Sequence, residues 1–451
     1  MCNTTSCKRT WAFLFCFTVF GSILVGTAAG QAISADATQP ESGRWYKGNL
    51  HTHSLWSDGN DFPEMICHWY KSQGYHFLAL TDHNILSQGE KWIDAEMPLK
   101  RGAIEPLERY RNAMGADWVQ TRTVDGKQQI RLKPLNEFRP LFDEAGKFLL
   151  IQGEEITDHF ERLPIHVNAT NLHDLISPQG GKSVRETMSK NLQAVQRQSE
   201  RIGRPIFAHL NHPNFGYAIT AEDMAHVQEE HFFEVYNGHP SVNHRGDARH
   251  ADMEHMWDIA NTIRLGELKQ PPLSGIATDD AHNYFGNQGA SVGRGWVMVR
   301  TNRLTPESII HALERADFYA SSGVVLKDVS FDESIGELRI EIDAQDGVQY
   351  ETRFIGTREN YDRATKPVLD KDGNELAVTQ SYSEDVGKLL SKTTDHVATY
   401  RLQGDELYVR AVVTSNQSPE NPAFDGQFQQ AWTQPVGWRK WLDKVDKAAE
   451  K

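Results

Sequence analysis

Cysteine is scarce in this sequence, and its placement excludes a disulfide framework. Of the four cysteines in 451 residues, three fall within the first sixteen positions. We expect that segment to be removed with a signal peptide, so only Cys67 remains and no intrachain disulfide can form. A chain of this length buries enough apolar surface to fold without such cross-links.

Long hydrophobic runs are also rare. The run at 11–25 follows Lys8 and Arg9 and is followed by small residues. This order is typical of a signal peptide over residues 1–30, with a single membrane anchor as the alternative. No later apolar stretch is long enough to span a bilayer. We therefore expect an exported protein, periplasmic or secreted, with no stable membrane span after signal removal.

Basic residues are outnumbered by acidic ones. The chain has 47 Lys and Arg against 61 Asp and Glu, which gives a formal net charge of −14 at pH 7. Binding to a nucleic-acid backbone requires clustered positive charge, so nucleic acid is not expected as a partner. Hydrophobic residues make up 39% and charged residues 24% of the chain, which is ordinary globular usage and excludes a disordered or fibrous protein.

Several common catalytic motifs are absent. The sequence has no Gly-x-Ser-x-Gly elbow, no Walker loop, no dinucleotide-binding glycine motif and no His-Glu-x-x-His. Histidine, by contrast, is abundant. All but one of the 19 histidines (His396) lie before residue 312, so they mark one part of the chain.

The pattern of apolar segments divides the chain into two regions. Between about residues 44 and 322, short apolar strands alternate with helical stretches, which predicts βαβ units and a parallel sheet or barrel. We expect strands at 77–80, 148–152, 165–169, 205–208, 232–236, 274–278 and 296–299, and helices near 62–73, 184–201, 249–265 and 306–315. A charged insertion with two short helical patches, at about 86–147, interrupts this order. From 324 to 440, alternation at period two predicts a small antiparallel β-sandwich-like domain.

Side chains suited to metal binding follow five of the predicted strands. They lie in the segments 49–59, 78–84, 149–156, 206–214 and 276–282, and His166 opens a further strand. His51 and His53 share a face because side chains alternate along an extended chain. Carboxyl ends of parallel strands meet on one face, where active sites form. Imidazole and carboxylate without thiolate suit zinc, manganese or iron.

Three of these segments offer two neighbouring or nearby choices. Either Glu154 or Glu155 points inward, and Asp280 rather than Asp279 shares a face with His282. One of His209 and His212 faces the site while the other supports it from behind. Tyr236, Asn237 and His239 either line the pocket or fill ordinary loop roles. Trp56 and Tyr284 either stack a substrate or pack in the core.

The order of these motifs resembles that of the PHP (polymerase and histidinol phosphatase) family. His-x-His, Asp, Asp-His, Gly-x-Glu, His, His-Pro and Asp-x-His follow one another between about residues 44 and 322. The resemblance implies a distorted seven-stranded (β/α) barrel that binds two or three divalent metal ions. It implies that Glu155 bridges two of them. The implied metal ligands are His51, His53, Asp58, His83, Glu155, His166, His212, Asp280 and His282.

Clustered dications would make a water nucleophilic and hold a substrate oxygen, which predicts a metal-dependent hydrolase. We favour a phosphoesterase acting on a small organic phosphate mono- or diester. The same site would serve a carbamate, ester or amide hydrolase, and a non-catalytic binding protein is the second alternative. The ions would also concentrate positive charge, which makes an anionic small-molecule substrate compatible with an acidic chain. The oligomeric state is not predicted.

Three residues are expected to act in catalysis. Glu155 does so through the metal ions. Asp82 either orients a ligand imidazole or caps a turn. Arg294 either clamps an anionic substrate with its planar fork or belongs to a surface turn.

Overall fold

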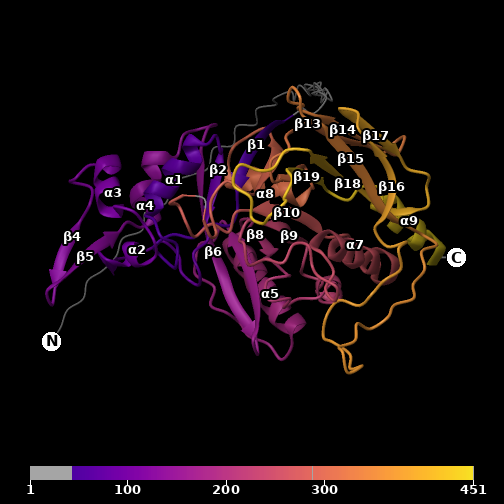
Figure 1. Cartoon of the computed structure of the whole chain (residues 1–451), viewed down its shortest axis with the longest axis horizontal. Coiled ribbons are helices and arrows are strands. Elements are labelled where there is room, and N and C mark those ends of the chain that lie inside the picture. The colour runs from indigo at the N-terminus through magenta and orange to yellow at the C-terminus, as the bar shows by residue number, and fades with distance from the viewer. Residues whose placement is uncertain (1–42, 287, 450–451) are drawn as a thin grey trace, which may run out of the picture. The chain divides into compact units, whose positions relative to one another are not determined.

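The strands expected between residues 77 and 301 are present and belong to one large mixed sheet (Figure 1). The computed structural model describes residues 43–286 and 288–449. The sheet has 13 strands. In pairing order they are β10 (Ser274–Thr278), β9 (Phe232–Asn237), β8 (Phe207–Leu210), β7 (Leu163–Thr170), β6 (Leu149–Phe160), β2 (Phe77–Leu80), β1 (Arg44–Asn49), β11 (Trp296–Thr301), β12 (Phe318–Ser321), β19 (Gln430–Thr433), β18 (Glu406–Ser415), β15 (Tyr350–Arg358) and β16 (Lys388–Thr393).

The strand directions explain why the fold is mixed rather than purely parallel. The neighbours β1, β2 and β6 run parallel, as do β8, β9 and β10. Between these two groups, β7 is antiparallel to both β6 and β8. The sheet curves so that β10 lies beside β11 and β12.

Helices accompany the strands as the alternation predicts. They are α1 (Pro63–Ser72), α5 (Val184–Ile202), α6 (Ala221–His226), α7 (Met253–Ile263), which continues as a π-helical turn (Arg264–Leu268), and α8 (Pro306–Glu314). Local sequence sets their starts. The Ser183 hydroxyl accepts the Glu186 N–H at the start of α5, and Thr220 and Asp223 form a capping box on α6. α5 packs on β6 and β7, and α8 packs on β11.

The insertion contains a three-stranded antiparallel sheet as well as helices, more than the two helical patches expected. Its elements are β3 (Lys91–Asp94), α2 (Met97–Lys100), α3 (Pro106–Met114), β4 (Thr121–Val124), β5 (Lys127–Leu132) and α4 (Leu135–Phe142). A hydrophobic cluster joins this insertion to the segment before α1. Within it, the rings of Phe62 and Tyr110 stack with centroids 4.0 Å apart. The insertion thereby packs directly against the loop that contains Asp58.

The strands after residue 324 are antiparallel, as expected. β13 (Leu326–Asp332), β14 (Glu337–Ile342) and β17 (Val397–Arg401) form a separate three-stranded sheet. Its inward side chains, including Leu338 and Ile340, share one hydrophobic core with Phe354 of β15 and Val409 of β18. β19 pairs with β12, so the large sheet continues from the first predicted region into the second.

A helix is the last described element of the chain. The helix α9 (Trp438–Ala449) follows the last strand, and the described residues form one compact unit. The predicted signal peptide, residues 1–30, lies outside the described residues. Within the described part of the chain, no helix combines the length and apolarity needed to cross a membrane.

Candidate metal centre

The nine side chains predicted as metal ligands lie together at one edge of the large sheet. His51 and His53 follow β1, His83 follows β2, and His212 follows β8. Asp280 and His282 follow β10. Contacts with Asp58, Glu155 and His166 join these residues into one continuous cluster.

Two of the nine lie within strands. For Glu155 this corrects the expected strand end at residue 152, whereas His166 lies in the strand expected at 165–169. β6 continues past Glu155 to Phe160, and His166 is the fourth residue of β7. The two strands form a long antiparallel hairpin in which Thr157 pairs with His166. Because β7 runs antiparallel to β6, its beginning lies at the same edge of the sheet as the carboxyl ends of the parallel strands.

The central group of ligand atoms has the spacing of a metal site. The His51 Nε2 atom lies 3.3 Å from Glu155 Oε2 and 3.2 Å from Asp280 Oδ1, and the corresponding distances from His53 Nε2 are 3.2 and 3.1 Å. The two Nε2 atoms are 3.1 Å apart. Bonds of about 2.0–2.1 Å to a tetrahedral ion place neighbouring ligand atoms about 3.3 Å apart. These four residues therefore fit one divalent ion.

A second group surrounds Asp58. The carboxylate lies 3.7 Å from His53 Nδ1, 3.5 Å from His83 Nε2 and 3.4 Å from His282 Nε2. Asp58 is the most exposed of the nine, with 51% of its side chain accessible, whereas Glu155 is 1% accessible. This group therefore forms the open side of the cluster.

A third group lies on the other side of Glu155. The Oε1 atom of this carboxylate is 2.9 Å from His166 Nδ1 and 3.5 Å from His212 Nε2. Its Oε2 atom faces the central group instead. With one oxygen directed at each group, Glu155 has the placement of a carboxylate that bridges two ions.

Hydrogen bonding and electrostatics both fit bound cations. Glu155 Oε2 and His53 Nδ1 are buried atoms without a hydrogen-bond partner, which is costly unless another group satisfies them. Burial alone lowers the pKa of His83, but the charges of Glu155 and Asp58 outweigh it and raise that pKa to about 11. Burial likewise opposes the shift at Asp280, yet His51 and neighbouring imidazoles hold its pKa well below the usual range. The carboxylates thus favour positive charge at His83 and beside Asp280, whether protons or metal ions supply it.

Two ligand residues adopt strained backbone conformations. His212 has φ = 24° and Asp280 has φ = 48°, in the left-handed region that side chains with a Cβ rarely adopt. The Asp280 N–H donates to the His51 carbonyl oxygen over 3.1 Å. Such strain persists where surrounding bonds enforce it, and it is common at functional sites.

The neighbouring residues that were alternatives to these ligands point elsewhere. Glu154 Oε2 accepts the Ile176 N–H, and burial raises the pKa of Glu154 to about 8. Asp279 accepts four hydrogen bonds, from Tyr70 and from the backbone of residues 293–295. His209 Nε2 lies 3.5 Å from Glu234 Oε1, behind His51. His212 is therefore the histidine of that pair that faces the cluster.

Asp82 holds a turn. Its carboxylate accepts hydrogen bonds of 2.6–3.0 Å from the backbone N–H and hydroxyl groups of Ser54 and Ser57. These contacts correspond to the turn alternative, and they fix the loop that presents Asp58. Orientation of a ligand imidazole by Asp82 stays a prediction.

Arg294 joins loops within the fold. This residue is 3% exposed, and its guanidinium donates to the carbonyl oxygens of Gly238 (2.8 Å) and Gly289 (2.7 Å) and to Asn421 Oδ1 (3.0 Å). It is not on the surface, and carbonyl oxygens already engage the donors that an anionic substrate would require. Its role as an anion clamp stays a prediction.

Among the aromatic candidates, packing roles prevail. Trp56 is 2% exposed, and the Tyr284 hydroxyl donates to the His53 carbonyl oxygen over 2.6 Å. Tyr236 is also buried. His239 is only partly buried, and its ring lies 5.6 Å from that of His282, at the edge of the cluster.

Glu234, within the strand expected at 232–236, is a further residue at the site and was not among the candidates. It is a fully buried carboxylate, 0% exposed, and its Oε1 atom lies 2.7 Å from His51 Nδ1. A charged residue inside an otherwise apolar strand is itself a signal, because such a group requires buried partners.

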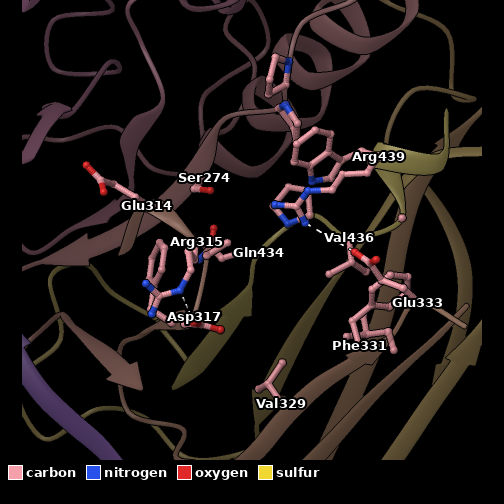
Figure 2. A pocket seen from close by; sticks show the side chains of 18 of the residues that line it. Ser274, Glu314, Arg315, Asp317, Val329, Phe331, Glu333, Gln434, Val436 and Arg439 are labelled. Carbon is pink, nitrogen blue, oxygen red and sulfur yellow. Dashed lines mark hydrogen bonds and ion pairs between the residues drawn. The ribbon is translucent and has the colours of Figure 1, made fainter. Parts of the chain in front are cut away.

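A cavity of about 540 Å³ lies away from this cluster, at the amino ends of β9 and β10 (Figure 2). None of the nine ligand residues lines it. Four of its labelled charges form two pairs: Arg315 contacts Asp317 at 3.1 Å and Arg439 contacts Glu333 at 3.7 Å. The cavity is therefore separate from the metal centre.

Comparisons with known proteins give distant likenesses. No family model matches the chain, and no curated protein does. The chain is similar to a solved structure from Bacteroides vulgatus, a two-domain protein containing a predicted PHP-like metal-dependent phosphoesterase. The sequence identity is 16%, the match covers 87% of this chain and 96% of that chain, and the TM-score is 0.37. It is also similar to a candidate metal-dependent phosphoesterase from Bifidobacterium adolescentis, with 13% identity, coverage of 54% and 92%, and a TM-score of 0.27. The metal centre itself is inferred from the side chains of this chain.

Proposed function

We propose that this protein is a PHP-type metal-dependent hydrolase, with small organic phosphate mono- or diesters as the favoured substrates. The observation that carries the proposal is the cluster of nine His, Asp and Glu side chains. Eight of them make up three groups of ligand atoms, and Asp280 lies 3.2 Å from His51 and 3.1 Å from His53. These groups support two or three divalent ions of zinc, manganese or iron. When bound, such ions acidify water and hold an ester oxygen.

The proposal extends to the fold and to the location of the protein. We propose a distorted seven-stranded barrel for the first region, supported by the approach of β10 to β11 and β12. A β-sandwich-like second region is supported by the core shared between β14 and β18. Export through residues 1–30 rests on the sequence pattern.

The exposed side of the cluster indicates where a substrate would bind. Asp58, His83 and His282 have side chains 51%, 25% and 21% accessible, whereas His51 and His53 are 0% accessible. A substrate would therefore approach over the Asp58 group. His239 lies next to His282, and its Nδ1 accepts the Ser241 N–H over 3.1 Å. In neutral His239 the proton is therefore on Nε2, so this atom remains available as a hydrogen-bond donor.

The second candidate is a carbamate, ester or amide hydrolase with the same metal site. The observation that favours it is the engagement of Arg294 by Gly238, Gly289 and Asn421, because these bonds occupy most of the N–H donors of the predicted phosphate clamp. An uncharged carbonyl substrate needs no such clamp.

The test is a substrate panel on protein stripped with a chelator and reloaded with manganese or zinc. We expect hydrolysis of aryl phosphates or phosphodiesters that is lost on chelation and returns with metal. Full activity without metal would remove the metallohydrolase proposal, and activity on aryl carbamates alone would select the second candidate. Replacing His51 and His53 with Ala should lower the bound metal measured by elemental analysis.

A further inference from the structure

A buried carboxylate lies directly beneath the metal centre. Glu234 belongs to β9, and neither its backbone nor its side chain is accessible to solvent. It is not among the nine predicted ligands. Burying a carboxylate costs several kcal/mol unless hydrogen bonds compensate it, so its surroundings should contain dedicated donors.

Four hydrogen bonds shorter than 3 Å surround this carboxylate. Oε1 lies 2.7 Å from His51 Nδ1 and 2.6 Å from the Thr278 hydroxyl. Oε2 accepts the His212 backbone N–H over 2.8 Å and the Asn237 side-chain N–H over 2.7 Å. Since an ionised carboxylate only accepts hydrogen bonds, His51 must carry its proton on Nδ1.

This proton position matters for metal binding by His51. With Nδ1 protonated, the lone pair of Nε2 is free, and Nε2 is the atom that faces Glu155 and Asp280. A histidine ligand whose second nitrogen donates to a carboxylate is fixed in tautomer and ring orientation and is the more basic for it.

The same carboxylate reaches two further ligands. Its bond to the His212 N–H holds the backbone at a residue with φ = 24°. Asn237, held by Oε2, also donates to Asp280 Oδ2 over 3.1 Å. One buried group thus contacts or supports His51, His212 and Asp280.

We propose that Glu234 is the positioning residue of the metal centre, setting the tautomer of His51 and the placement of His212 and Asp280. The inference rests on the proposed metal centre and is independent of the substrate. It predicts a specific defect for Glu234→Gln. The His212 N–H cannot reverse its polarity, so the Gln oxygen stays on that side and the Gln NH₂ group faces His51. His51 must then accept through Nδ1 and carry its proton on Nε2, where it blocks the metal.

The experiment compares metal binding and tautomer state in the wild-type chain and Glu234→Gln. Zinc affinity, measured by competition with a chromophoric chelator, should fall roughly 10–100-fold in the variant. Nitrogen-15 spectra of the histidine side chains should show His51 protonated on Nδ1 in the zinc-loaded wild type and on Nε2 in the variant. Equal zinc affinity in the two proteins, or a wild-type His51 protonated on Nε2, would overturn the inference. A wild type that binds no zinc would instead remove the proposed function.

Two matched variants separate positioning from packing. Glu230, just before β9, is also 0% exposed and accepts the N–H groups of His231 and Phe232, far along the strand from the cluster. Glu230→Gln should keep the zinc affinity of the wild type. Thr278→Val removes the hydroxyl that donates to Glu234 Oε1 but leaves the bond from His51 in place. In this variant, His51 should keep its proton on Nδ1 and the protein should keep its zinc affinity. A loss in either control as large as in Glu234→Gln would refute a specific role for Glu234. If Glu234→Gln does not fold, the wild-type His51 tautomer still decides the question.

Discussion

Replacing Asp279 or Asp280, the adjacent aspartates after β10, with Asn should impair different properties of the protein. Asp279 Oδ2 accepts from the Tyr70 hydroxyl (2.7 Å) and the Gly293 N–H (2.8 Å), and Oδ1 accepts from the N–H groups of Arg294 (2.6 Å) and Gly295 (2.8 Å). Asp280 instead faces the imidazoles of the metal centre. Asp279→Asn should therefore weaken the fold, and Asp280→Asn should weaken metal binding.

The size of the Asp279 effect follows from its four donors. The asparagine NH₂ group is best placed at the Oδ2 position, where the Tyr70 hydroxyl can turn to accept from it and only the Gly293 N–H is left without an acceptor. That lost bond to a charged acceptor costs about 1.5–3 kcal/mol, and the remaining bonds, now to a neutral group, weaken by about 1 kcal/mol each, so the loss is about 3–6 kcal/mol. Burial raises the pKa of Asp279, so removing its charge offsets part of this loss. We expect the free energy of unfolding to fall by about 2–4 kcal/mol, which a domain of ordinary stability survives.

Urea unfolding and elemental analysis of the same preparations measure both effects. Asp279→Asn should retain wild-type metal content with a lower unfolding midpoint. Asp280→Asn should lose at least one equivalent of metal, and after chelation its stability should stay closer to that of the wild type. Loss of metal from Asp279→Asn at unchanged stability would refute the assignment of the two side chains.

Two further changes test separate parts of the structure. Gly59→Ala would place a Cβ atom 2.5 Å from the His53 carbonyl oxygen, so it should displace the loop that carries Asp58. The metal content measured by elemental analysis should fall, and an unchanged content would contradict the close approach of residue 59 to His53. Burial raises the pKa of Glu230 from 4.5 to about 8, so the folded state holds a proton that the unfolded state releases. Stability should therefore fall as pH rises from about 4.5 to about 8, and Glu230→Gln should remove roughly 5 kcal/mol of that fall in pH-dependent unfolding. Parallel pH profiles for the two proteins would refute the shift.

The sequence was most informative where the relevant interactions are local. Alternation at period two separates Asp280 from Asp279, and the strand at 274–278 is confirmed to the residue. The end of β6, expected at residue 152, was wrong because a polar, ligand-bearing segment continues to Phe160 as one arm of a hairpin. Its pairing depends on the partner strand and not on its own hydrophobicity.

What the sequence could not predict depends on contacts between distant segments. Arg294 lies in a glycine-rich turn, and only the folded chain brings Asn421, 127 positions later, to its guanidinium. Glu234 and His51 are 183 positions apart. The sheet within the insertion was not predicted. Its strand β4 is exposed along its whole length and therefore lacks the alternation of apolar and polar residues that indicates a strand.

The pairing of β12 with β19 has a consequence for any attempt to isolate the hydrolytic region. A fragment ending near residue 322 would leave β12 as a bare edge strand, whose unpaired N–H and C=O groups favour aggregation. It would also lose Asn421, which contacts the Arg294 side chain that braces the loops after β9 and β10. The natural unit for expression, mutagenesis and transplantation of this metal centre thus includes β19 and the segment around Asn421.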